Sequence, residues 1–249
     1  MRNYLAWHDD YERPGSRLHL RLLVVQDLIA AALDDARPGA IRVVSMCAGQ
    51  GRDVITVACR HRRGDDLVGR LVELDPRNVA VARAAISDAE LAGLEVVEGD
   101  AGRSDSYIGA TPADLVLACG IFGNITDDDV KSTVEFMPAL CAPGAWVIWT
   151  RGPRDDQILE RIEGWFTATG FESRALVIGA GNLFGVGAAQ FRGEPRRGAS
   201  RRPALRLLPL TTDAGSPAPG ACSVAPPGPQ KTEETERCRC SATKASGWS

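Results

Sequence analysis

Apolar residues recur along the chain in two alternating patterns. Short runs that are apolar almost throughout lie near residues 41–47, 68–74, 94–99, 114–119 and 144–150. Stretches with helical spacing of apolar positions lie between or after them, near residues 51–62, 76–92, 126–137 and 154–169. Continuous apolar runs are typical of strands buried on both faces of a parallel sheet. The alternation therefore predicts an α/β domain in which helices connect parallel strands.

The pattern differs at both ends of this alternating region. From Ser16 to about Ala36, apolar residues recur at helical spacing, which predicts an amphipathic helix capped by Ser16. After the last helical stretch, residues 171–178 and 183–191 are strand-like and flank the turn sequence Gly-Ala-Gly-Asn. This arrangement predicts an antiparallel hairpin that closes the sheet.

Three of the apolar runs are followed by glycines or acidic residues. The first leads into Cys-Ala-Gly-Gln-Gly-Arg-Asp at residues 47–53, the second ends in Glu73-Leu74-Asp75-Pro76, and the third ends in Glu98-Gly99-Asp100-Ala101. Glycines let the backbone approach a ligand closely, and ligands of open α/β sheets bind at the carboxyl ends of the strands. Two spaced carboxylates at that edge suit a nucleoside, one for the ribose hydroxyls and one for a base amino group.

In this ordered set of motifs, residues 41–192 resemble the class I S-adenosylmethionine-dependent methyltransferases. The resemblance implies a Rossmann-like, seven-stranded, mostly parallel sheet with a C-terminal antiparallel hairpin. It also implies that the glycine loop packs against the methionine part of the cofactor, that Glu73 binds the ribose and that Asp100 reads the adenine. We therefore expect the S-adenosylmethionine site to be formed by Ala48, Gly49, Gly51, Glu73, Leu74, Asp100, Ala101 and Cys119.

The chain departs from the family pattern at two positions. Ser45 stands where the family usually has an acid near the end of the first strand, and Cys47 replaces the first glycine of the loop. Small side chains are kept at both positions, so access for the cofactor is retained. The missing acid leaves the amino group of the cofactor with fewer partners.

The acceptor is expected to lie near the end of the fourth strand, where Cys119 leads into a glycine-containing loop. Phe122 and Asn124 offer an apolar and a polar contact there, although Asn124 can equally serve the turn itself. Tyr11 belongs to an aromatic-rich N-terminal segment with Tyr4, Trp7 and His8. This segment either packs on the edge of the sheet or forms a lid over the site, and we expect Tyr11 to contact the acceptor.

The sequence indicates no particular catalytic residue. Methyl transfer from a sulfonium is an in-line displacement that relies on positioning, and a base is needed only if the acceptor must lose a proton. Asp127, Asp128 and Asp129 follow Thr126, a favourable N-cap, so helix capping is a better interpretation than a metal site. Arg151, just past the fifth strand, is expected to pair with a neighbouring acid or, alternatively, with an acceptor carboxylate.

Composition divides the 249 residues into three predicted parts: an N-terminal cap at 1–38, the methyltransferase domain at 39–192 and a disordered tail at 193–249. The tail holds 8 of the 15 prolines and has little hydrophobic periodicity. It also holds nine Lys and Arg against five Asp and Glu, so the preceding residues carry a net charge of −7. We expect no nucleic-acid partner for such an acidic domain. With no apolar run approaching a membrane span and no signal-peptide pattern, we expect a cytoplasmic protein.

The leading hypothesis is a methyltransferase with a small-molecule acceptor, and two alternatives remain open. One is an NAD(P)-dependent oxidoreductase, because Gly49-Gln50-Gly51 resembles the start of a dinucleotide fingerprint, although Val54 occupies its third glycine position. The other is a catalytically silent protein that keeps the fold and the cofactor, a reading based on Ser45 and Cys47.

Overall fold

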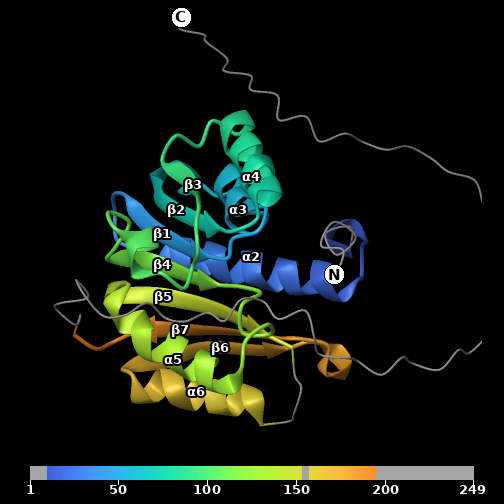
Figure 1. Ribbon diagram of the computed structural model, residues 1–249, viewed down its shortest axis with the longest axis vertical. Coiled ribbons are helices and arrows are strands. Elements are labelled where there is room, and N and C mark those ends of the chain that lie inside the picture. Colours follow the sequence, from blue (N-terminus) through green and yellow to red (C-terminus); the bar gives the residue numbers. More distant parts are fainter. Residues whose placement is uncertain (1–9, 153–156, 195–249) are drawn as a thin grey trace, which may run out of the picture. The chain divides into compact units, whose positions relative to one another are not determined.

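A computed structural model describes residues 10–152 and 157–194 of the chain (Figure 1). Within them, seven strands form one sheet in the order β3-β2-β1-β4-β5-β7-β6. The strands are β1 (Ile41–Met46), β2 (Leu67–Glu73), β3 (Leu94–Glu98), β4 (Ala113–Ala118), β5 (Cys141–Arg151), β6 (Phe171–Ile178) and β7 (Gly185–Phe191). Strands β1 to β5 pair in parallel, and β7 is antiparallel to both β5 and β6. The predicted parallel sheet and closing hairpin are confirmed.

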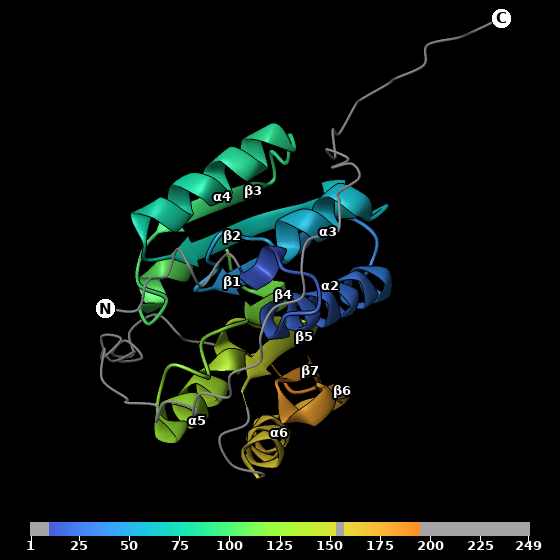
Figure 2. The same ribbon diagram turned by 90° about the vertical axis from the view of Figure 1, so that its right-hand side faces the viewer.

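Helices cover both faces of this sheet (Figures 1 and 2). They are α2 (Arg17–Asp35), α3 (Val54–Arg60), α4 (Pro76–Asp88), α5 (Asp127–Phe136) and α6 (Ile158–Ala168). Short 3-10 turns lie at η1 (Gly64–Asp66), η2 (Ser104–Tyr107), η3 (Met137–Ala139) and η4 (Ala180–Asn182). Buried residues of α2, α3 and α4 share one apolar cluster, and those of α5 and α6 share the other.

The central strands are buried on both sides, as the continuous apolar runs predict. Val43 of β1 belongs to the cluster under α2 and α3, whereas its neighbour Val44 belongs to the opposite cluster. Strand β5 begins at Cys141, earlier than the predicted start near 144, because Cys141 already pairs with Ala113 before a register shift in the β4–β5 ladder.

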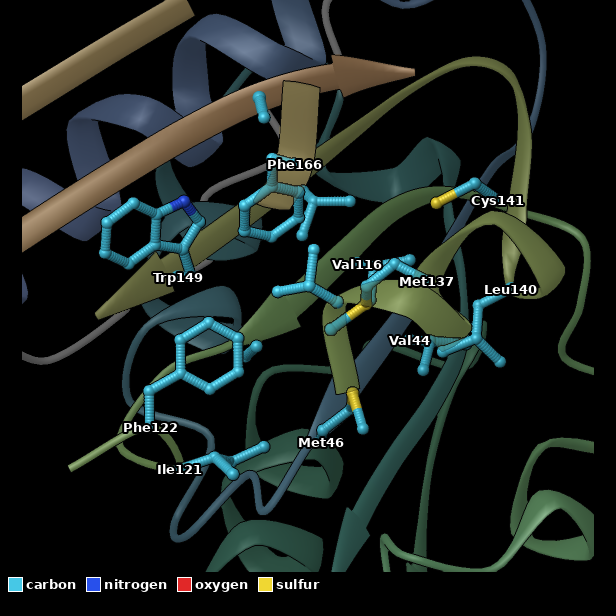
Figure 3. Packing of buried hydrophobic residues seen from close by; sticks show 14 of the residues in the cluster. Val44, Met46, Val116, Ile121, Phe122, Met137, Leu140, Cys141, Trp149 and Phe166 are labelled. Atoms are coloured by element: carbon cyan, nitrogen blue, oxygen red, sulfur yellow. The ribbon is translucent and has the colours of Figure 1, made fainter. Parts of the chain in front are cut away.

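Aromatic rings fill the core between β5 and α6. The Trp149 ring lies with its centroid 6.1 Å from that of Phe122 and 6.1 Å from that of Phe166 (Figure 3). Gly187 on the adjacent strand β7 leaves room for this indole, since a Cβ added there would collide with the Trp149 ring. The glycine in the middle of a strand is thus explained by close packing.

The C-terminal end of α2 is fixed to the rest of the domain by one arginine. The Arg63 guanidinium donates to the carbonyl oxygens of Leu33, Ala36, Arg37 and Gly39 at distances of 2.6–3.1 Å. These include carbonyls that the end of a helix leaves without intrahelical partners. Only 11% of the Arg63 side chain is exposed, whereas 71% of the neighbouring Arg62 side chain is exposed.

Trp146 and Gln190 hold the same end of α2 through the Asp35 carboxylate. Asp35 accepts hydrogen bonds from Trp146 Nε1 at 2.9 Å and from Gln190 Nε2 at 3.0 Å. A carboxylate is unfavourable at a helix C-terminus. The two donors from β5 and β7 offset this cost and link the helix to the far half of the sheet.

The predicted caps at the other helix ends are confirmed. The Ser16 side chain accepts from the His19 amide, and Thr126 and Asp129 form a reciprocal capping box at the start of α5. Asp127 pairs with Arg151 at 2.8 Å and with Arg161 at 2.9 Å, which joins α5 to β5 and α6.

No helix in the described ranges is long and apolar enough to cross a membrane. The predictions for Tyr4, Trp7, His8 and the tail from residue 195 onward lie outside the described residues.

We predict that Arg63→Met lowers the free energy of unfolding by about 1–3 kcal/mol, because several acceptors lose a charged donor in a place that water reaches poorly. Urea denaturation measures the change. Arg62→Met is the matched control, since Arg62 is 71% exposed and pairs only across the surface with Asp34. Equal effects of the two substitutions would contradict the role assigned to Arg63.

Candidate functional site

The loop after β1 follows an unusual backbone path. Cys47, Gly49 and Gly51 have φ angles of +50°, +57° and +69°, in the left-handed region that favours glycine. The Ala48 amide donates to the Val72 carbonyl at 2.9 Å, so the loop folds toward the end of β2. A Cβ on Gly51 would lie 2.6 Å from Ile55 Cδ1 and 2.9 Å from Leu71 Cδ2, so this glycine also permits close packing of α3 on the sheet.

The Glu73 carboxylate joins the ends of neighbouring strands. One oxygen accepts from the Gly49 amide at 2.7 Å and the other from the Asp75 amide at 2.9 Å. The Glu73 carbonyl also accepts from the Gly99 amide at 2.9 Å, which brings the end of β3 alongside. Only 8% of Glu73 is exposed. A carboxylate offers about four acceptor positions, so its oxygens can still receive hydroxyl donors.

Asp100 lies close to the same loop. One of its carboxylate oxygens accepts from the Gly102 amide at 2.7 Å, which fixes the turn after β3. Cys47 is an exposed residue, but the surrounding protein desolvates its thiol and raises the pKa to about 12, with the negative charges of Glu73 and Asp100 acting in the same direction. Both carboxylates therefore lie within electrostatic reach of the loop.

The neighbours of these acids differ in exposure. Leu74 is 62% exposed, which is unusual for a large apolar side chain beside a polar loop, whereas Ala101 is buried. Asp75 caps α4 through the Arg77 amide. We call the assembly of the 47–51 loop, residues 73–75 and residues 100–101 the strand-end site.

The N-terminal part of the described chain lies against this site. Figure 2 looks onto the carboxyl ends of the strands, where the blue segment that begins at residue 10 lies before β1 and β4. Arg52 of the glycine loop donates to Glu12 at 3.0 Å, and Gln26 donates to the Arg52 carbonyl at 3.0 Å. Both contacts hold residues 10–26 beside the loop.

Four side chains from this segment, α2, the start of α3 and the end of β4 lie within electrostatic reach of one another. Arg21 Nη2 donates to the Tyr11 hydroxyl at 2.8 Å. Burial raises the pKa of Tyr11, opposed by Arg21 and reinforced by the charges of Asp53 and Cys119. Burial also raises the pKa of Asp53, again opposed in part by Arg21. We call Tyr11, Arg21, Asp53 and Cys119 the Arg21 cluster.

Arg21 and Asp53 were not among the residues expected from the sequence. A signal was nevertheless present, because Arg21 interrupts the apolar row Leu18, Val25 and Ile29, whose side chains are buried on α2. A charged residue on the buried face of an amphipathic helix needs polar partners. For Arg21 these partners lie at the edge of the sheet where the strand motifs end.

The remaining candidate residues lie in different environments. Phe122 is 0% exposed and packs on Trp149, so it belongs to the core and not to an exposed loop surface. The Asn124 amide donates to the Gly120 carbonyl at 2.7 Å, in agreement with a role in the turn. Cys119 belongs to the Arg21 cluster and is partly exposed, and desolvation by the surrounding protein raises the pKa of its thiol well above the ordinary value.

Metal chemistry finds no support in the part of the chain that the structure covers. There, no group of three or more His, Cys, Asp or Glu residues is placed to hold a metal ion. Asp127, the first of the three successive acids, instead forms its ion pairs with arginines.

Strand order, closing hairpin and strand-end site together define a methyltransferase-type α/β domain. The chain belongs to a family described as "Putative methyltransferase", whose model matches residues 14–170. No curated protein matches it in sequence at a significant level.

Several solved structures of methyltransferases share the fold. One is magnesium protoporphyrin IX methyltransferase from Synechocystis PCC 6803 with bound S-adenosylmethionine, which is 12% identical, with a TM-score of 0.59 over 76% of this chain and 91% of that one. Another is an O-methyltransferase family protein from Burkholderia thailandensis, which is 16% identical, with a TM-score of 0.54 over 70% of this chain and 55% of that one. The CurJ carbon methyltransferase is 15% identical, with a TM-score of 0.58 over 76% of this chain and 58% of that one.

We predict that Cys47→Gly is more stable than Cys47→Val. The left-handed conformation at this position costs about 1–2 kcal/mol for an L-residue, and a β-branched side chain tolerates it least. Thermal unfolding of the two variants beside the parent protein measures the ranking. A valine variant as stable as the glycine variant would show that the loop relaxes away from the positive φ.

Proposed function

We propose that the protein is an S-adenosylmethionine-dependent methyltransferase that acts on a small-molecule acceptor. The observation that carries this proposal is the buried Glu73 carboxylate, which is hydrogen-bonded to the Gly49 amide and stands beside Asp100 on the next strand end. Family membership and a fold shared with methyltransferases of known structure support the same conclusion.

The residues of the strand-end site fit this cofactor in their chemistry. Glu73 can accept hydrogen bonds from both ribose hydroxyls, and Asp100 can accept one from an amino group of the base. The exposed Leu74 side chain supplies an apolar surface next to both acids, which a nucleoside base would cover. Ala48, Gly49 and Gly51 would border the methionine half, where small residues let it approach the backbone.

When bound, S-adenosylmethionine supplies an activated methyl group on a sulfonium that leaves as a neutral thioether. The protein then has to orient the acceptor and exclude water, which accounts for much of the rate in reactions of this kind. The raised pKa values keep Tyr11 and Cys119 protonated near neutral pH, so both can donate hydrogen bonds but neither is a ready base. We infer that Tyr11 orients the acceptor by donating from its hydroxyl.

A small molecule is the acceptor class that the chain supports best. Residues 1–192 carry a net charge of −7, which disfavours a nucleic-acid surface. The magnesium protoporphyrin IX methyltransferase described above is an example of this fold that is named for a small-molecule substrate.

A silent cofactor-binding protein is the second candidate function. It is favoured by two features of the first strand and its loop. Ser45 is 1% exposed and occupies the position of an expected acid, and Cys47 adopts a left-handed backbone conformation that favours glycine. Transfer of a labelled methyl group from S-adenosylmethionine to small molecules of a cell extract distinguishes the two candidates. A protein that binds the cofactor but labels nothing in any extract would leave the silent binder as the better account.

We predict that S-adenosylhomocysteine raises the melting temperature and that NAD does not. A ligand at one hundred times its dissociation constant adds about 2.7 kcal/mol to the stability of the folded state. Differential scanning fluorimetry with each ligand at millimolar concentration is the measurement. Stabilisation by NAD alone would favour the oxidoreductase, and the absence of any shift would remove the cofactor assignment.

We predict that Glu73→Ala weakens the binding of S-adenosylhomocysteine far more than Asp75→Ala. Loss of hydrogen bonds to a charged acceptor costs about 1.5–3 kcal/mol each. Asp75, by contrast, serves as the N-cap of α4, so its loss should lower stability by about 1 kcal/mol while sparing affinity. Calorimetric titration of both variants gives the ranking, and the reverse order would mean that Asp75 is the ribose ligand.

A further inference from the structure

Arg21 occupies a position that packing alone does not explain. It lies on α2 in the row of Leu18, Val25 and Ile29, which are 2%, 3% and 0% exposed. A lysine or arginine placed among such residues carries a desolvation cost unless its charge meets polar partners. The arginine is directed to the Tyr11 hydroxyl, to which it donates at 2.8 Å.

The position of Arg21 is fixed relative to the glycine loop. The Arg52 side chain donates to Glu12, and the Arg52 carbonyl oxygen accepts from Gln26. Arg21 and its partner Tyr11 therefore lie within a segment whose two ends are both hydrogen-bonded to Arg52, the residue after Gly51.

A buried acid, Asp53, lies within electrostatic reach of this arginine. Asp53 caps α3, with one carboxylate oxygen accepting from the Val54 amide at 2.8 Å, and the residue is only 9% exposed. Arg21 and Asp53 thus present opposite charges beside the same loop. The methionine half of the proposed cofactor is itself a zwitterion, with one carboxylate and one ammonium group on the same carbon.

We propose that Arg21 and Asp53 recognise the amino-acid end of the cofactor, with Arg21 binding the carboxylate and Asp53 facing the ammonium group. This inference rests on the proposed function. It accounts for the absence of an acid at Ser45, because an ammonium partner is supplied from the start of α3 instead of from β1. It also gives the N-terminal segment a role in binding, since the carboxylate ligand comes from α2.

The test compares two ligands that differ in the amino-acid end. S-adenosylhomocysteine has it, whereas 5′-methylthioadenosine keeps only the nucleoside and thioether. Isothermal titration of Arg21→Met should show a loss of about 10- to 100-fold in affinity for S-adenosylhomocysteine and no change for 5′-methylthioadenosine. Arg21→Lys should recover part of the loss, because it restores the charge without the planar fork.

Asp53→Asn tests the second charge and preserves the helix cap, since asparagine caps a helix as well as aspartate does. It too should weaken S-adenosylhomocysteine selectively. The matched control is Arg192→Met, which removes an exposed guanidinium paired with Glu172 at the opposite edge of the sheet and should affect neither ligand.

The outcomes separate this inference from the proposed function. If wild-type protein binds both ligands and Arg21→Met weakens both equally, or neither, Arg21 is structural and the inference is overturned. If wild-type protein binds neither ligand, the proposed function fails first and the inference fails with it. Retained binding of 5′-methylthioadenosine by Arg21→Met shows that the variant is folded at the site.

Discussion

The arrangement of the site depends on one carboxylate that satisfies two backbone amides. Glu73 ends β2, yet its oxygens hold Gly49 of the loop after β1 and Asp75 at the start of α4. Its negative charge is offset by amide donors and not by a basic side chain. Such a group fixes the relative position of three chain segments while it remains able to accept hydroxyl donors from a ligand.

The fold could be predicted closely from the sequence because its signals are local and agree with one another. Continuous apolar runs marked strands buried on both faces, and Ser16 and Thr126 marked helix starts that the structure confirms. The start of β5 was missed because its first residues pair with β4 in a shifted register, and no local pattern records such a pairing.

The candidate site was predictable only in part. Motif residues that follow strands come together because topology brings strand ends to one edge, so Glu73 and Asp100 could be grouped in advance. Arg63 binds backbone carbonyls that are distant in sequence and carry no sequence signal, and Asp53 is brought near Arg21 only by the fold. Phe122 is buried by the aromatic packing around Trp149, a contact across the core that its place in a glycine-containing loop does not indicate.

Helix α2 is attached in two different ways along its length. Its C-terminal end is held by hydrogen bonds of Arg63 and Asp35, whereas its N-terminal half is joined to the glycine loop through Arg52. Substitutions in the first half can therefore change what the site accepts while the second half keeps the domain folded. Such a division allows new specificities to arise by drift in residues 10–26 without loss of the scaffold.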